Sequence, residues 1–284
     1  MKHALNSRTV LTVRFDNIKA GWEQRILLRS DAHHDNLHCN HTLERKHLQE
    51  AKDSGAWILD GGDQFCAMQG KWDKRADQTQ MRDELRGNNY LDKLVKYNAD
   101  FLAPFADRFL LFGLGNHETS ILKYHQTNLT ERMVERLNSK LNGHTVYCGG
   151  FTGYVRFLFT CNGTKRFSKN LFLHHGYGGG GAVTRGVIQT NRMAVYLPDA
   201  DVVWTGHTHD EWVVPIQRDR LSHGGEQYQD EQLHVRTPGY KDEYADGHGG
   251  WHIERGAAPK PIGAIWLVFK FRGDRISMDF SRAK

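Results

Sequence analysis

Five short clusters of potential metal-binding residues occur between Asp31 and His209. In chain order they are Asp31-Ala32-His33, Gly62-Asp63, Gly115-Asn116-His117-Glu118, His174-His175-Gly176 and Gly206-His207-Thr208-His209. Together they offer carboxylate oxygen, amide oxygen and imidazole nitrogen as ligands. This mixture suits Mn²⁺, Fe, Ni²⁺ or Zn²⁺ better than Ca²⁺, so the clusters indicate a transition-metal site.

Each cluster alone has an ordinary structural explanation. A Gly-Asp pair is usually a turn, a Gly-Asn-His run is often a loop, and a single His174 or His175 is more often a core histidine than a ligand. The complete ordered set is what favours a metal centre. Within the fourth cluster we prefer His175 to His174 as the ligand, because His175 lies nearest Gly176 and the strand end.

Each cluster follows a short β-rich run, and helical patterns lie between these runs. The predicted strands cover residues 25–29, 56–59, 109–114, 170–173 and 201–204. The apolar residues with helical spacing are Leu43, Leu48 and Ala51 in one segment and Leu129, Met133, Leu137 and Leu141 in another. This alternation predicts an α/β core whose strand-end loops meet at one edge, where ligands bind.

The C-terminal third reads as strands with little helical periodicity between them. The predicted strands are 213–216, 232–236, 262–271 and 275–280, which we expect to form a second sheet packed on the first. The expected fold is therefore α/β, with two packed mixed sheets flanked by helices and the metal site at strand-end loops. We expect one domain over residues 1–284, with active-site loops at 64–89 and 238–261 because both exceed usual connection lengths.

The composition is that of an ordinary soluble globular protein. Of 284 residues, 39% are hydrophobic and 25% are charged, and the net charge of +5 with a pI near 8.9 is a mild basic bias. A solvated basic surface explains that bias better than a nucleic-acid footprint. The four cysteines form no zinc-ribbon spacing, and no apolar stretch is long enough for a membrane span, so we expect a cytoplasmic protein without membrane contact.

The ordered clusters resemble the D-x-H, G-D, G-N-H-E, H and G-H-x-H motifs of the calcineurin-like metallophosphoesterases, and some of them are similar to phage-borne members. The resemblance implies two divalent cations, with manganese favoured and Fe, Ni or Zn as alternatives. It assigns the ligands of one cation to Asp31, His33, Asp63 and His209, and those of the other to Asp63, Asn116, His175 and His207. Asp63 would bridge the pair, since a carboxylate offsets the repulsion between two close cations.

The resemblance also implies that His117 faces the scissile phosphate as an acid or charge stabiliser and does not bind metal. Two departures from the pattern matter. Cys66 stands where many members carry an Asp that orients this histidine, so the orienting group is open. Ala67 stands where the protein phosphatases carry a phosphate-gripping Arg, which disfavours a protein phosphatase.

The leading hypothesis is a nuclease or other phosphodiesterase that acts on a nucleic acid or a nucleotide. A phosphomonoesterase is the first alternative. A catalytically inactive binding module on the same fold is the second, although all expected ligand types and His117 are present. The sequence identifies no protein partner.

Overall fold

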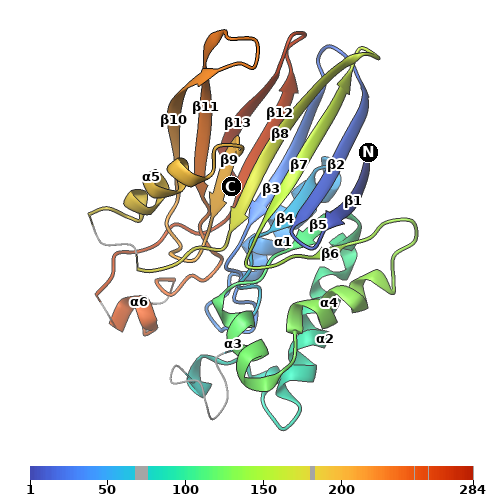
Figure 1. Cartoon of the computed structure of the whole chain (residues 1–284). Coiled ribbons are helices and arrows are strands. Elements are labelled where there is room, and N and C mark those ends of the chain that lie inside the picture. The colour runs from blue at the N-terminus through green and yellow to red at the C-terminus, as the bar shows by residue number, and fades with distance from the viewer. Residues whose placement is uncertain (68–75, 180–182, 246, 255, 284) are drawn as a thin grey trace.

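A computed structural model describes residues 1–67, 76–179, 183–245, 247–254 and 256–283, and two β-sheets dominate it (Figure 1). In spatial order the seven-stranded sheet contains β1 (Lys2–Ser7), β2 (Val10–Ile18), β7 (Thr152–Cys161), β8 (Lys165–His174), β9 (Val202–Thr205), β11 (Gln227–Arg236) and β10 (Trp212–Leu221). The six-stranded sheet contains β13 (Ile276–Arg282), β12 (Ile265–Phe271), β3 (Glu23–Arg29), β4 (Trp57–Asp60), β5 (Phe109–Phe112) and β6 (Tyr147–Cys148).

Both sheets are mixed. In the six-stranded sheet, β3 to β6 run parallel, whereas β12 pairs antiparallel with both β3 and β13. In the seven-stranded sheet, β8, β9 and β11 run parallel. The carboxyl ends of these parallel strands carry the five sequence clusters, so the topology places the clusters at the ends of two facing sheets.

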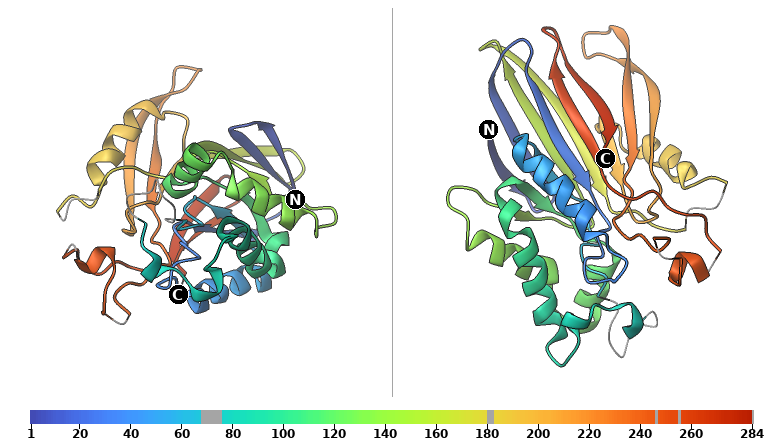
Figure 2. Two further views of the ribbon diagram at one scale, coloured as in Figure 1. Left: turned by 90° about the horizontal axis from the view of Figure 1, so that it is seen from below. Right: turned by 180° about the vertical axis from the view of Figure 1, so that it is seen from behind.

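Helices cover the outer faces of the two sheets (Figures 1 and 2). The α-helices are α1 (His41–Asp53), α2 (Tyr90–Leu102), α3 (Asn116–His125), α4 (Leu129–Asn138), α5 (Val187–Tyr196) and α6 (Trp251–Glu254). Three short 3₁₀ turns are η1 (Gln78–Gln80), η2 (Asp83–Leu85) and η3 (Ala103–Arg108). None of the helices in the described residues is long and apolar enough to cross a membrane.

Three buried clusters define the layers. Leu48 of α1, Leu94 of α2 and Met133 of α4 pack with Ile58 and Phe109 on the outer face of the six-stranded sheet. A second cluster, which includes Leu28, Phe157, Trp204, Val235 and Phe269, fills the space between the sheets. Met193 of α5 packs with Val203 on the outer face of the seven-stranded sheet. The result confirms the predicted α/β/β/α sandwich.

Local side chains begin both helices that the apolar spacing predicts. The Asn40 side chain accepts a hydrogen bond from the Leu43 backbone N–H at 3.0 Å, and Asn128 accepts one from Glu131 N–H at 3.1 Å. Each is an N-cap that satisfies an otherwise unpaired amide. Helix α4 ends at Asn138, so Leu141 lies beyond the helix that its spacing predicted.

The prediction that the C-terminal strands alone make the second sheet is wrong. Strands β10 and β11 extend the seven-stranded sheet beside β9, whereas β12 and β13 join the six-stranded sheet beside β3. The sequence reading also missed the N-terminal hairpin of β1 and β2, and strand β7, which completes the seven-stranded sheet. Strand propensity marks a segment as extended, but pairing partners depend on contacts far apart in the chain.

Candidate metal centre

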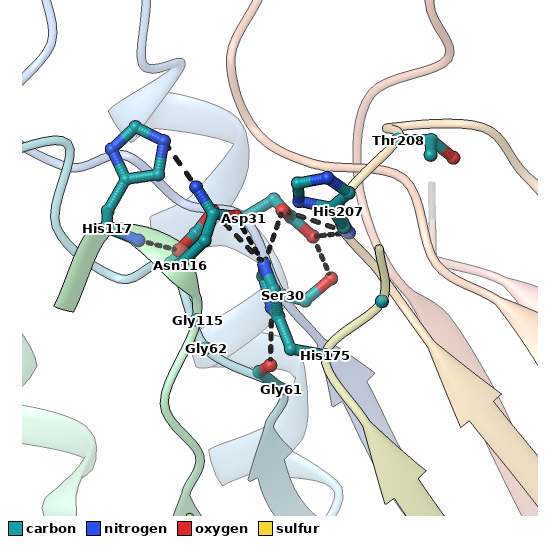
Figure 3. Close-up of polar contacts among 12 residues, drawn as sticks. Ser30, Asp31, Gly61, Gly62, Gly115, Asn116, His117, His175, His207 and Thr208 are labelled. Atoms are coloured by element: carbon teal, nitrogen blue, oxygen red, sulfur yellow. Dashed lines mark hydrogen bonds and ion pairs between the residues drawn. The ribbon is translucent and has the colours of Figure 1, made fainter. Parts of the chain in front are cut away.

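The five clusters converge at one edge of the sandwich (Figure 3). Asp31 and His33 follow β3, and Asp63 follows β4 in the same sheet. Backbone hydrogen bonds from Asp31 N–H to the Gly62 oxygen (2.9 Å) and from His33 N–H to the Asp63 oxygen (3.0 Å) hold these two loops side by side. Asn116 begins α3 after β5.

The remaining clusters come from the seven-stranded sheet. His175 follows β8, and His207 and His209 follow β9. The backbone N–H of Gly206 donates to the His175 oxygen at 2.8 Å, which aligns the two loops. His174, the last residue of β8, instead uses Nδ1 to accept the Gly176 N–H at 2.9 Å. Of the two adjacent histidines, His175 is therefore the one that faces the centre.

Left-handed backbone conformations are concentrated at these positions. Five of the seven predicted ligand residues have positive φ, with values of 54° at Asp31, 45° at His33, 53° at Asp63, 73° at His207 and 56° at His209. Such conformations are uncommon for residues with a Cβ and cost of order 1 kcal/mol or more each. Strain of this kind clusters at functional sites, where it aims side chains that an extended strand would direct elsewhere.

Two glycines bring the backbone close to the carboxylates. A Cβ on Gly115 would lie 2.0 Å from Asp63 Oδ1, and a Cβ on Gly206 would lie 2.4 Å from Asp31 Oδ2. Both distances are far below van der Waals contact. Glycine is therefore required at these positions because any side chain would displace an acidic group of the centre.

One donor group consists of Asp31, His33 and His209, whose potential ligand atoms lie within 4.8 Å of one another. The Nε2 atoms of the two histidines are 3.2 Å apart, and His209 Nε2 lies 3.6 Å from Asp31 Oδ1. All three side chains are buried. Burial and the neighbouring His117 lower the pKa of His33 well below its usual value, which favours the neutral imidazole that a metal requires.

A second donor group consists of Asp63, His175 and His207, again within 4.8 Å. His175 Nε2 lies 3.2 Å from both Asp63 Oδ2 and Asn116 Oδ1. The opposite ring nitrogen, Nδ1, donates to the Gly61 carbonyl oxygen at 2.9 Å. This outer hydrogen bond fixes the ring and directs Nε2 toward the carboxylate, as in metal-bound histidines of other proteins.

These donor groups fit divalent cations. Each combines one carboxylate with two imidazoles, and the buried Nδ1 atoms of His33 and His209 have no hydrogen-bond partner among the described residues. The Nε2 atoms of the same two histidines face each other at 3.2 Å, close to Asp31. A cation between the carboxylate and the two Nε2 atoms would be coordinated by all three donors.

His117 lies at the side of these groups. Its backbone N–H donates to Asp63 Oδ1 at 2.9 Å, and its ring Nε2 is 3.7 Å from Asp63 Oδ2. Ring Nδ1 donates to the backbone oxygen of Cys66 at 2.5 Å. The Cys66 backbone carbonyl therefore orients the His117 ring in place of the absent Asp side chain.

His33, His117 and the Cys66 thiol also lie within 4.8 Å of one another. Burial raises the pKa of the Cys66 thiol to about 12. A thiol with this pKa stays protonated at neutral pH, and the thiolate is the form that binds metals. This third group is therefore a poorer cation site than the other two.

Glu118 is a residue whose role the sequence reading missed. Its carboxylate accepts backbone N–H groups from Asp63 (3.0 Å), Phe65 (3.0 Å) and Gly115 (2.8 Å). Glu118 thus joins the loop after β4 to the start of α3 and holds Asp63 beside Asn116. The sequence feature that could have pointed to Glu118 is its position at the end of the Gly-Asn-His-Glu run.

Arg236 is a second missed residue. It is 1% exposed at the end of β11, and its guanidinium donates to the Thr205 hydroxyl at 3.1 Å and the Thr208 hydroxyl at 2.8 Å. These bonds support the turn that carries His207 and His209. No motif marks Arg236, because only the parallel pairing of β11 with β9 brings it there.

Described residues of the segment 238–261, which leave out 246 and 255, lie against the centre. The backbone N–H of Tyr240 donates to the Asp31 oxygen at 3.0 Å, and the rings of His252 and His209 are 5.5 Å apart. Lys260 pairs with Asp210 at 2.7 Å. In the segment 64–89, Cys66 contacts His117, whereas 68–75 lie outside the described residues.

No protein-family model matches the sequence, and no curated protein matches it significantly. Among solved structures, the chain is similar to vacuolar protein sorting 29 from Cryptosporidium parvum, with 13% identity over 92% of this chain and 98% of that chain and a TM-score of 0.41.

Two further structures are similar to the same degree. Wild-type Vps29 complexed with Zn²⁺ from Entamoeba histolytica has 10% identity over 92% of this chain and 100% of that chain, with a TM-score of 0.40. A predicted phosphoesterase from Streptococcus pneumoniae has 11% identity over 93% of this chain and 92% of that chain, with a TM-score of 0.34. At these values the likenesses transfer no activity, so function must be judged from this chain's own residues.

Proposed function

We propose that this protein is a dinuclear-metal phosphoesterase that hydrolyses a phosphodiester such as a nucleic acid or a nucleotide. The observation that carries the proposal is the convergence of two carboxylate-imidazole groups at strand ends, with left-handed backbone at five of the seven residues. Donor sets of this composition hold transition metals, and backbone strain at such positions favours a catalytic over a structural role.

One cation would be held by Asp31, His33, Asp63 and His209, and the other by Asp63, Asn116, His175 and His207, with manganese favoured. When bound, such a pair supplies Lewis acidity to the phosphate oxygens and makes a water more acidic. Asp63 would serve both cations because it lies between the two donor groups: its Oδ2 is 3.2 Å from His175 Nε2 of one group, and its backbone oxygen accepts the His33 N–H of the other. The segment 238–261, with its contacts to Asp31 and His209, would form one wall of the substrate site.

His117 would act on the leaving group. With Nδ1–H donated to the Cys66 oxygen, the only ring nitrogen free to face a substrate is Nε2. A proton on Nε2 passes to the leaving oxygen as the phosphorus–oxygen bond breaks. This donor matters for a diester, because its alkoxide is a poor leaving group. A diester is also a monoanion, with less charge than a monoester dianion, so it needs no Arg at the position of Ala67.

The test is reconstitution of the purified protein with Mn²⁺, Zn²⁺, Ni²⁺ or Mg²⁺, followed by assays on bis-p-nitrophenyl phosphate and p-nitrophenyl phosphate. We expect a higher kcat/KM for the diester with Mn²⁺. On methyl phenyl phosphate, whose phenol leaving group needs a proton, the variant His117→Ala should lower kcat by about 10² to 10⁴ while metal content stays normal. Exposed His125 on the same helix provides the control, and His125→Ala should leave kcat unchanged.

Each alternative predicts a different result. A higher kcat/KM for the monoester would make the protein a phosphomonoesterase and overturn the diester preference. Metal binding without hydrolysis of either ester, or of DNA, RNA and cyclic nucleotides, would indicate a binding module. Loss of a metal in His117→Ala would show that His117 is a ligand.

A further inference from the structure

The peptide group between Cys66 and Ala67 lies between His117 and a second carboxylate, Asp35. On one side, the Cys66 carbonyl oxygen accepts His117 Nδ1–H at 2.5 Å. On the other side, the Ala67 N–H donates to Asp35 Oδ2 at 2.9 Å. The same peptide plane thus connects an imidazole donor to a carboxylate acceptor.

Hydrogen bonds fix the Asp35 side chain in this position. Its other oxygen, Oδ1, accepts the Cys66 N–H at 2.6 Å, and the Tyr90 hydroxyl donates to Oδ2 at 2.6 Å. Asp35 is 2% exposed, and Cys66 and Ala67 are 5% and 2% exposed. Three donors from two different segments therefore hold one buried carboxylate in place.

The backbone at Ala67 supports the same conclusion. Its φ is +48°, a left-handed conformation that alanine adopts only at a cost of about 1 kcal/mol. The two amide bonds to Asp35 stabilise that conformation, and this conformation turns the Cys66 oxygen toward His117. Without the carboxylate, nothing else among the described contacts of this turn holds both amides.

We propose that Asp35 is a positioning residue for His117, acting through the Cys66–Ala67 peptide. A carboxylate that accepts an amide N–H polarises that amide, so its carbonyl becomes a stronger acceptor. The peptide-relayed contact would keep Nδ1 protonated and Nε2 directed at the leaving group. This inference rests on the proposed function, and it supplies the orienting carboxylate that a direct Asp–His pair would otherwise provide.

The variant Asp35→Asn tests the inference. Asparagine has one acceptor oxygen, and its NH₂ group would face one of the two amide N–H groups, so the turn loses a bond and gains a repulsive contact. With Mn²⁺, we expect kcat for a methyl aryl diester with a phenol leaving group to fall about 10- to 100-fold. For the 2,4-dinitrophenol analogue, which departs without a proton, kcat should change less than about threefold.

Two further variants separate positioning from general structural damage. Tyr90→Phe removes one hydrogen bond to Asp35 and should give a smaller loss with the same leaving-group dependence. Asp35→Asn added to His117→Ala should cause no further loss, because the residue it positions is already absent. Exposed Asp92 on α2 supplies the matched carboxylate control, and Asp92→Asn should leave both substrates unaffected.

Three results would overturn the inference. They are an equal loss of kcat for both leaving groups in Asp35→Asn, an additive loss of kcat when Asp35→Asn is combined with His117→Ala, and a lowered metal content in Asp35→Asn. Failure of the proposed function is recognised separately, by absence of hydrolysis in the wild-type protein. In that case the proton NMR signal of His117 Nδ1–H in the Zn²⁺-loaded protein, which we expect downfield, still tests whether Asp35 acts on His117. It should move upfield in Asp35→Asn and Tyr90→Phe, and an unchanged resonance in both would refute the relay.

Discussion

His33 and His34 are adjacent in the chain, yet they belong to two clusters of opposite character. His33 joins Asp31 and His209 at the strand-end centre. His34 joins Glu44 and His41 in a cluster on the other side of the same loop, where the potential ligand atoms also lie within 4.8 Å. By residue type and proximity alone, both clusters could hold a cation.

The difference is a buried guanidinium. Fully buried Arg29 pairs with Glu44 at 3.0 Å and with Asp60 at 3.1 Å, and Glu44 in turn lies 3.3 Å from His34. Burial lowers the pKa of His34, with a further contribution from His41, so its ring is neutral beside the ion pair. The Arg29 cation already compensates the Glu44 carboxylate of this second cluster, and it would repel a metal there.

Backbone conformation also separates the two clusters. Asp31, His33 and His209 all have positive φ, whereas His34, His41 and Glu44 do not. The second cluster is instead packed, with the His34 ring stacked on His41 at 4.0 Å and edge-on to Phe101 at 4.3 Å. Charge balance and strain together distinguish this candidate metal centre from the buried network of His34, which ligand composition alone does not do.

The largest expected effect comes from Asp63→Asn. An amide lacks the charge needed to bridge two cations, so bound metal should fall from two to one or fewer per chain, and diester hydrolysis should be lost. Metal analysis after saturation with Mn²⁺ and dialysis gives the stoichiometry. Two cations retained in the variant would show that Asp63 does not bridge.

The adjacent histidines provide the sharpest comparison. His33→Gln should weaken metal binding by about 10-fold or more, with little change in the stability of the metal-free protein. His34→Gln should retain normal metal content but lower the free energy of unfolding by about 1 to 3 kcal/mol, because it disturbs the buried contact between the His34 ring and Glu44. Urea unfolding and metal titration of both variants measure these effects. If His34→Gln loses metal as His33→Gln does, the two clusters do not differ as described.

The last expected effect is the pH dependence of the free energy of unfolding that Glu44 contributes. Burial raises the pKa of Glu44 to about 7 despite the charge of Arg29, whereas the unfolded value is 4.5. The folded protein therefore binds a proton that the unfolded chain has released, so this group makes the free energy of unfolding fall as pH rises from about 4.5 to 7. The slope is at most about 1.4 kcal/mol per pH unit.

Urea unfolding of the wild type and Glu44→Gln at pH 5, 6, 7 and 8 measures this contribution. Glutamine remains neutral throughout, so the wild-type stability relative to the variant should decrease between pH 5 and 7 and then level off. A difference that increases with pH would mean that Arg29 keeps Glu44 ionised in the folded state. The ion pair would then stabilise the fold more than burial opposes it.

The local sequence predicted the parts of the fold that depend on neighbouring residues. The strand before each cluster and the caps at Asn40 and Asn128 follow from short-range patterns and side chains that bond nearby amides. The sheet order did not follow, because β10 and β12 have similar strand character yet join different sheets. Non-local pairing decides that outcome.

The sequence by itself determined which side chains could bind metal, since residue type sets the ligand atoms and ordered spacing places them after strands. Tertiary structure alone decided that His33 and His34 enter different clusters, that Arg236 supports the turn carrying His207 and His209, and that a backbone carbonyl orients His117. Each of these depends on the direction of a side chain or peptide plane. Such directions are set by φ angles and by contacts between residues distant in the chain, which no local pattern encodes.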